Sequence, residues 1–582
     1  MRAPARTVGE NRYAATSSWV SSNHSALDGE QMPSSNGVRS RPEHRREGKS
    51  CQTCSSREEP LSARVGRRVP FDDARPRSTP RSPRWEASWI AFMGPLCEVP
   101  GLARSVNMKH PPFAAVVALW SALVLGRPSH ASEQGTAARA DEFVGCPDAT
   151  EDSALAGSLC ARFSAPLDYA EPSRERIELF VRKFPAPGRA AGQVWLVAGG
   201  PGESGASFYP LLKTLRAAFP GYDLLIPDHR GTGFSGRLCQ KEEAADSVGG
   251  AALQGAEWAT CFEALESDSK RTRAFTITHA AHDLRALMNR YSASRPTWLY
   301  GVSYGTQLVL RTMTVAPPRR LDGIVLDSLV PPETTGQWDL SHRSAVVDEI
   351  GRAVLAHCDA DPSCRARLGG SAVAAMQGLV DDPKLSASVP GGRPKRFFGS
   401  LLDSPELRAR IPLVLAGLRG GDLGPLRQVQ HDLEALSAQF DRFPQSSVSI
   451  PLVSVISASE NNARPDLTEA QVEAEAAQYL FVSSLPGLLV GRTSLAYPRD
   501  EWFGRSPAAL PPVLVLQGDM DPKTPHAGAQ AHIRLLPKAA GVSLFTVKGG
   551  PHFLLFTAPD CFTAAVGAFV QKRRAPRSAC SI

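Results

Sequence analysis

Ser303 is the first residue of this sequence whose surroundings suggest covalent chemistry, because it stands between Gly301 and Gly305 in the pattern Gly-Val-Ser-Tyr-Gly. A serine hydroxyl is a weak nucleophile until a positioned base accepts its proton, and a carboxylate must hold that base in the correct tautomer. Further along, the chain supplies an aspartate at Asp521 and a histidine at His552. The order serine, aspartate, histidine predicts nucleophilic attack on a carbonyl group.

Three other residues compete for the two supporting roles. Asp519 lies in the same loop as Asp521, and Asp327 ends the strand that follows the serine. A second histidine, His526, would have to act from the start of a helix. We favour Asp521 and His552 because each follows an apolar strand pattern, and catalytic groups of open α/β sheets gather at the carboxyl ends of strands.

The glycine-rich segment "AGGPGESG", residues 198–205, offers a place for the negative oxygen of an acyl-transfer transition state. It follows an apolar strand pattern, and its glycines let the backbone approach a substrate. We predict an oxyanion hole made by the N–H groups of Gly200 and Tyr304, since Pro201 has no N–H to donate. Neither glycine pattern typical of nucleotide-binding loops follows this strand.

These groups need a scaffold of alternating strands and helices. Apolar strand patterns occur at 177–181, 194–197, 224–226, 297–300, 324–326, 513–516 and 544–547. Helical patterns follow at 279–291 and at 307–315, directly after the serine. Strands and helices in turn predict an α/β protein whose mostly parallel sheet is covered on both faces.

The alternation of strand and helix patterns stops in residues 331–510, which carry helix-like stretches such as 345–357 and 469–480. The last two strands come only after this part. We therefore interpret it as an inserted helical cap or lid, and 143–330 and 511–582 as the two parts of one core.

The amino-terminal part differs from the rest. Residues 1–107 mix Arg, Ser, Pro and Gly without an apolar period, and we interpret them as a doubtful leader, disordered or the product of upstream over-translation. Residues 108–131 have the basic start, short apolar run and small-residue exit of a signal peptide. The run is too short to span a bilayer of about 30 Å. We expect an exported protein, periplasmic or extracellular, with no stable membrane anchor after cleavage.

Cysteine usage favours export as well. Three of the 11 cysteines, Cys51, Cys54 and Cys97, lie in the leader. The other eight fall into four couples that are local in sequence, which in an oxidising compartment predicts four disulfides. They are Cys146, Cys160, Cys239, Cys261, Cys358, Cys364, Cys561 and Cys580.

Composition limits the class of protein and its partners. With 582 residues, 42% of them hydrophobic, the chain is globular rather than fibrous or disordered. Its net charge of +7 comes with arginines crowded into the first hundred residues, so we expect no nucleic-acid partner. After the leader and signal peptide, no cluster of histidines and cysteines has ligand spacing, and we expect no metal and no other cofactor. Nothing in the sequence indicates the oligomeric state.

Five ordered motifs resemble the α/β-hydrolases of the proline iminopeptidase and tripeptidyl aminopeptidase family, the TAP-like peptidases of group S33. The resemblance runs from about residue 146 to 580. The motifs are "GGPGESG" at 199–205, "DHRGTGFSG" at 228–236, "GVSYG" at 301–305, "GDMDPKTP" at 518–525 and "GGPH" at 549–552.

This resemblance implies an α/β-hydrolase fold and a secreted serine exopeptidase that acts near a free peptide amino terminus. It implies that Ser303, Asp521 and His552 form the catalytic triad, and that the partner is a short peptide or another small-molecule substrate. A hydrolase of carboxylic esters or other small molecules, with the same triad, is the alternative.

Recognition of a substrate ammonium group requires a carboxylate. Glu460 matches a family segment in which Cys and Asp are common where this chain has Ala458 and Asn461, so the resemblance implies an amine-binding role for Glu460 with two departures. Glu203, beside the oxyanion loop, is a rival for that role.

The motif at 228–236 has His229 where the family usually has Gln. We expect no catalytic role for His229. We expect Asp228 and Arg230 to form an ion pair that fixes the turn.

Overall fold

The computed structural model describes residues 142–582, apart from 245, 251, 539–540 and 573–578. The leader, the predicted signal peptide and the cysteines at 51, 54 and 97 lie outside the described residues.

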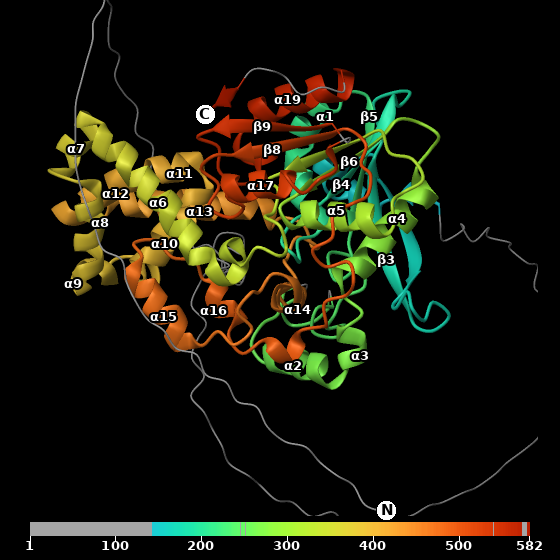
Figure 1. Ribbon diagram of the computed structural model, residues 1–582, viewed down its shortest axis with the longest axis horizontal. Helices are drawn as coiled ribbons and strands as arrows, with labels where there is room; N and C mark the ends of the chain where they lie inside the picture. The colour runs from blue at the N-terminus through green and yellow to red at the C-terminus, as the bar shows by residue number, and fades with distance from the viewer. Residues whose placement is uncertain (1–141, 245, 251, 539–540, 573–578) are drawn as a thin grey trace, which may run out of the picture. The chain divides into compact units, whose positions relative to one another are not determined.

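A ten-stranded sheet runs through the described chain in the order β1-β2-β3-β5-β4-β6-β7-β8-β9-β10 (Figure 1). The strands from β5 to β10 in that order pair in parallel, whereas β1, β2, β3 and β5 pair antiparallel. The bounds are β1 Val144–Gly145, β2 Leu159–Pro166, β3 Arg176–Phe184, β4 Gly192–Val197, β5 Tyr222–Asp228, β6 Thr297–Val302, β7 Gly323–Asp327, β8 Val513–Gly518, β9 Val542–Lys548 and β10 Cys580–Ser581. The mostly parallel sheet is confirmed.

The two faces of the central strands belong to two different hydrophobic cores. Every residue of β4, β6, β7 and β8 is buried. Alternate residues point to opposite faces. One face packs against α4 (Ile277–Tyr291) and α5 (Tyr304–Val315), and the other against α1 (Leu212–Ala218) and α19 (Pro559–Lys572). A strand covered on both sides can be apolar throughout, which explains the continuous apolar runs in the sequence.

Helices fill the long connection between β7 and β8 (Figure 1). Their bounds are α6 Arg343–Ala360, α7 Pro362–Leu368, α8 Ala372–Asp381, α9 Pro383–Ala387, α10 Pro394–Ser400, α11 Pro405–Ala409, α12 Ile411–Gly420, α13 Gly424–Phe440, α14 Ile450–Glu460, α15 Glu469–Gln478 and α16 Leu485–Leu489. Several of them share a core of their own, built on residues such as Leu355, Met376 and Leu415.

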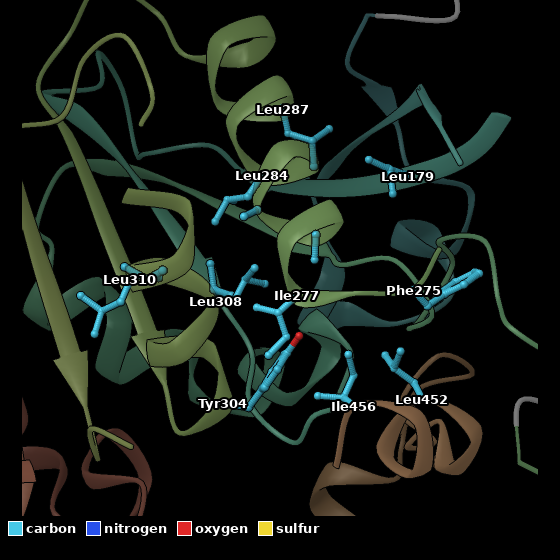
Figure 2. Packing of buried hydrophobic residues seen from close by; sticks show 14 of the residues in the cluster. Leu179, Phe275, Ile277, Leu284, Leu287, Tyr304, Leu308, Leu310, Leu452 and Ile456 are labelled. Atoms are coloured by element: carbon cyan, nitrogen blue, oxygen red, sulfur yellow. The ribbon is translucent and has the colours of Figure 1, made fainter. Parts of the chain in front are cut away.

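One helix of this connection, α14, packs instead on the core beneath the sheet. Its residues Leu452 and Ile456 belong to the same buried cluster as Ile277 and Tyr304, and Figure 2 shows them side by side. This contact attaches the helical connection to the edge of the sheet where Ser303 lies. The remaining helices are α2 Glu257–Ser267, α3 Ser269–Thr272, α17 His526–Ile533 and α18 Leu554–Thr557.

Three strands, β1, β2 and β10, were not expected from the sequence. In β2 buried residues alternate irregularly with exposed ones, so the segment has no apolar run, and β1 and β10 are two residues long. These strands lie at or near the edges of the sheet, where burial on both faces is not required.

Four disulfides join the eight cysteines of the described chain, each to its neighbour in sequence. The pairs are Cys146–Cys160, Cys239–Cys261, Cys358–Cys364 and Cys561–Cys580. The last of them ties β10 to α19. Among the described residues, no helix is both long enough and apolar enough to cross a membrane.

The expected ion pair between Asp228 and Arg230 is wrong. Asp228 accepts hydrogen bonds from the backbone N–H groups of Gly205 (2.7 Å) and Phe234 (2.8 Å). Arg230 turns to α4 and donates to Asp283 through Nε (2.7 Å) and Nη2 (2.9 Å). The reason is that the carboxylate of Asp228 is needed to close the turn, whereas the buried guanidinium finds a bidentate partner on the neighbouring helix.

Candidate active site

Ser303 lies in a sharp turn between β6 and α5, with φ 53° and ψ −125°. A residue other than glycine is strained at such a φ, and that strain is typical of functional sites. Both neighbouring glycines are required by the closeness of the backbone. A Cβ on Gly301 would lie 2.6 Å from the carbonyl oxygen of Gly305, and a Cβ on Gly305 would lie 2.7 Å from that of Ala198.

Asp521 and His552 contact each other in the loops that follow β8 and β9. His552 Nδ1 lies 2.9 Å from Asp521 Oδ2 and 3.1 Å from Oδ1. The fully buried carboxylate also accepts the N–H groups of Lys523 and Thr524, both at 2.8 Å. Burial alone would raise the pKa of Asp521, but His552 and these N–H groups outweigh it, so the pKa lies below its usual value. Asp521 is thus held as a carboxylate that can orient the imidazole.

The competing residues have other partners. Asp519 accepts the N–H of Gly549 at 2.6 Å. Asp327 is fully buried and accepts Tyr300 Oη (2.9 Å) as well as the N–H groups at the start of α18. His526 lies 2.9 Å from the hydroxyl of Thr546. Of the acids considered from the sequence, only Asp521 has a hydrogen bond to His552.

Ser303 and His552 line one cavity of about 260 Å³, together with Gly200 and Tyr304. The described structure contains no hydrogen bond between the Ser303 hydroxyl and His552. Contacts of this kind often tighten only in the substrate complex. The serine hydroxyl and the imidazole predicted to react with a substrate therefore line the same space.

The two predicted oxyanion donors lie at this cavity. Tyr304 is the first residue of α5, so its N–H has no acceptor within the helix. Gly200 has φ +107°, and a Cβ there would lie 2.6 Å from the nitrogen of Gly202. Only glycine therefore fits this position of the loop, and the arrangement suits an oxyanion.

Glu460 lies at the end of α14, lines the same cavity and is 3% exposed. Its Oε2 accepts from Arg311 Nη2 at 2.6 Å, and its Oε1 accepts from the Tyr497 hydroxyl at 2.7 Å. Glu333 accepts from the same Arg311 nitrogen at 2.9 Å. Burial raises the pKa of Glu460, and the neighbouring Glu333 adds to the shift against the effect of Arg311.

Sequence reasoning missed Glu333 and Arg311. One signal was present for Arg311, because it is the one charged residue in the segment 304–315 and stands about two helical turns after Ser303. Glu333 follows two prolines in a loop, where an acidic residue is common and gives no signal of function.

Comparison with known proteins agrees with this geometry. Residues 194–365 match the family model described as alpha/beta hydrolase fold, and residues 496–580 match the one described as TAP-like protein. The chain is a serine hydrolase of the α/β-hydrolase fold, and its C-terminal part is TAP-like.

The curated relatives of this α/β-hydrolase include serine protease Hip1 of Mycobacterium tuberculosis and its counterpart in Mycobacterium bovis. Each is 24% identical over 457 residues, which cover 71% of this chain and 85% of the relative. Similar solved structures include VinJ, with 13% identity, a TM-score of 0.32 and coverage of 71% of this chain and 98% of that chain. An esterase from Thermogutta terrifontis has 15% identity, a TM-score of 0.31 and coverage of 71% and 98%.

Glu203 is a second acid at the active site of this α/β-hydrolase. A Cβ built on Gly199 would lie 3.2 Å from both Glu203 Oε2 and Ser303 Cβ, so the carboxyl group lies beside the serine. Burial raises the pKa of Glu203 to about 7, although Lys523 and His552 act in the opposite direction. Glu203 is therefore a group that changes its charge near neutral pH next to the predicted oxyanion loop.

His229, which replaces the usual Gln, does not line the cavity. Its Nδ1 lies 3.1 Å from the carbonyl oxygen of Arg230, and burial lowers its pKa to about 4. Among the residues described, no group of three His, Cys, Asp or Glu side chains is arranged to hold a metal ion.

The contact between Asp521 and His552 predicts that Asp521→Asn will lower kcat by about 10³- to 10⁴-fold, because the amide cannot hold the same imidazole tautomer. Steady-state kinetics on any substrate that the wild type turns over will measure the effect. Asp519→Asn, in the same loop, is the matched control and should cost less than about tenfold, since Asp519 bonds a backbone N–H rather than His552. A larger loss in Asp519→Asn than in Asp521→Asn would contradict the assignment.

The raised pKa of Glu203 predicts that Glu203→Gln will stabilise the fold more at pH 8 than at pH 5. The folded state favours the protonated form of Glu203. The stability that this protonation contributes is complete below the ordinary pKa of 4.5 and is lost as pH rises through about 7. The gain from the substitution in the free energy of unfolding should be about 2 kcal/mol larger at pH 8, measured by chemical unfolding. Glu434→Gln, at an exposed position of α13, should show no such difference. An equal effect of Glu203→Gln at both pH values would refute the shift.

Proposed function

We propose that this α/β-hydrolase is a serine exopeptidase that cleaves a peptide bond near a free amino terminus through an acyl-enzyme. The observation that carries the proposal is the acidic cluster in the cavity of Ser303, where Glu460 and Glu333 share one guanidinium group. The TAP-like match and the relative named serine protease support the same reading.

The cluster has more negative than positive charge. Arg311 supplies one positive charge to Glu460 and Glu333, and Asp500 adds a third carboxylate 3.7 Å from Arg311 Nη1. Glu460 and Glu333 line the cavity. Unlike Asp500, the side chains of Glu460 and Glu333 are largely buried, and two carboxylates with one guanidinium group away from water favour a ligand that brings a cation. The ammonium group of a peptide amino terminus is such a cation.

In this proposal the hydroxyl oxygen of Ser303 attacks the carbonyl carbon while His552 accepts the hydroxyl proton and Asp521 stabilises the imidazolium. The N–H groups of Gly200 and Tyr304 stabilise the oxyanion. The carbon–nitrogen bond then breaks, and His552 returns the proton to the leaving amine. Water hydrolyses the acyl-enzyme by the same steps in reverse order.

A hydrolase of carboxylic esters is the second candidate, and one observation favours it. Both oxygens of Glu460 already have partners within the chain, Arg311 and Tyr497. If the cluster serves only to attach α14 to α5, no ammonium group is required, and the same triad would act on uncharged esters.

We also propose export to an oxidising compartment, supported by the four disulfides, which persist outside the cytosol. Amino-terminal sequencing of the native protein tests this, with a mature terminus close to residue 132 expected. A mature chain that retains residues before Met108 would be evidence against it.

A panel of four substrates tests the proposed function: a proline arylamide, a tripeptide arylamide with a free amine, its amine-blocked form and a short acyl ester. We expect cleavage of a free-amine arylamide and a loss of about 10- to 100-fold in kcat/KM on amine blocking, because a charged contact is lost. Ser303→Ala should abolish turnover of every substrate. Arylamide cleavage that survives amine blocking unchanged would defeat the exopeptidase proposal, and turnover of the ester alone would favour the second candidate.

A further inference from the structure

Arg343 is a buried cation that the proposed mechanism does not use. It is the first residue of α6, it is 6% exposed, and it lines the same cavity as Ser303 and His552. Its guanidinium group forms no hydrogen bond and no ion pair with any residue that the structure describes, and its Nε is buried without a partner. A guanidinium group carries five N–H donors and keeps its charge, so an unpaired one at a cavity calls for an anion.

The carboxylates near Arg343 are engaged elsewhere. Asp521 holds His552, and Asp403 Oδ2 accepts Lys523 Nζ at 3.1 Å. Asp339 bonds Ser341 Oγ and His342 Nδ1, both at 2.8 Å. The one free acceptor among these is Asp403 Oδ1, which is buried without a partner.

The charge of Arg343 persists at neutral pH. Burial lowers its pKa to about 10, against the opposing effect of Asp521, Asp403 and Asp339. A buried cation without a partner is destabilising. This destabilisation arises at the wall of the cavity that contains Ser303, and a substrate anion bound to Arg343 would remove it.

The position of Arg343 indicates which part of a substrate it would meet. Arg343 lines the same cavity as His552, Asp403 and Lys523, and the ion pair of Asp403 with Lys523 brings this part of the wall to the loop that carries Asp521. In an acyl transfer the histidine gives its proton to the leaving amine, so the leaving part of the substrate lies close to His552. The acidic cluster has a different set of partners, Arg311 and Tyr497.

We propose that Arg343 binds a carboxylate in the leaving part of the peptide, close to the bond that is cleaved. The proposal rests on the proposed exopeptidase function and extends it to the other side of the scissile bond. Such a carboxylate has two sources: the free α-carboxylate of a very short peptide, or an acidic side chain directly after the scissile bond. In both cases a planar carboxylate can accept two parallel hydrogen bonds from the guanidinium.

The test uses three peptides that begin with the unit of the arylamide cleaved fastest by the wild type. The first continues with one alanine as the free acid, the second with one alanine as the amide, and the third with one aspartate as the amide. We expect kcat/KM for the free acid to exceed that for the alanine amide by about 10- to 100-fold. A preference for the aspartate amide as well would identify a side-chain carboxylate as a sufficient source, and its absence would identify the α-carboxylate.

Arg343→Met removes the charge and keeps much of the volume, and Arg343→Lys keeps the charge without the planar fork. The preference for the free acid over the alanine amide should fall to about one in Arg343→Met and be partly retained in Arg343→Lys. This preference is a ratio within one variant, so a general loss of activity or of folded protein does not change it. Arg352→Met is the matched control, because Arg352 lies on the same helix and pairs with Asp348 away from the cavity.

Equal kcat/KM for all three peptides in the wild type would overturn the proposal, as would a preference for a carboxylate that survives in Arg343→Met. Pairing of Arg343 with Asp403 instead of substrate would produce that first result, and a ratio that rises above one in Asp403→Asn would identify this pairing. If no peptide is cleaved, calorimetric binding of the free acid and the alanine amide to Ser303→Ala decides. Tighter binding of the free acid, lost on adding Arg343→Met, would support the carboxylate site even though the exopeptidase proposal had failed. If neither peptide binds, both the carboxylate site and the exopeptidase proposal are overturned.

Discussion

The close approach of Gly305 to the end of β4 is the contact on which the rest of the active site depends. A Cβ on Gly305 would lie 2.7 Å from the carbonyl oxygen of Ala198, so no larger residue lets α5 begin where it does. That contact holds Ser303 at the strained turn and brings it beside the loop of Gly200. The same helix then carries Arg311 about two turns further on, to the acidic cluster. One backbone contact thereby sets the positions of the proposed nucleophile, the predicted oxyanion loop and the centre of the charged site.

The acids at and beside the cavity differ in whether their partners outweigh the effect of burial on the pKa. Asp521 accepts backbone N–H groups, a hydroxyl and the imidazole, and its pKa is lowered in spite of burial. Glu203 and Glu460 have raised pKa values because burial outweighs their partners. A protein that needed only stability would not retain such groups, and strained or poorly compensated groups gather where function requires them. The imbalance marks the parts of the cavity that we assign to substrate recognition.

The sequence predicted the residues proposed for catalysis more completely than the residues proposed to recognise the substrate. The positions of Ser303, Asp521 and His552 follow from strands that end at one edge of a parallel sheet, a rule that needs only apolar runs and the residues after them. No such rule joins Arg311, Glu333 and Glu460, which meet only because α14 packs on the core beneath the sheet. Short-range reasoning was wrong for Arg230, which bonds Asp283 on α4 rather than its neighbour in the chain. It also missed edge strands such as β2, whose half-exposed residues show no apolar run.

The groups proposed for catalysis and those proposed for recognition come from different parts of the chain. The sheet and its loops carry Ser303 and His552, whereas the helical connection carries Glu460 at the end of α14 and Arg343 at the start of α6. The two parts meet through Leu452 and Ile456 in the core, through the ion pair of Arg311 with Glu460, and through that of Lys523 with Asp403. Changes in the helical connection can therefore alter which charged substrate fits without disturbing the contact between Asp521 and His552. Under the proposed function, the charges at the cavity wall, rather than the triad, are the part of this α/β-hydrolase that decides what it cleaves.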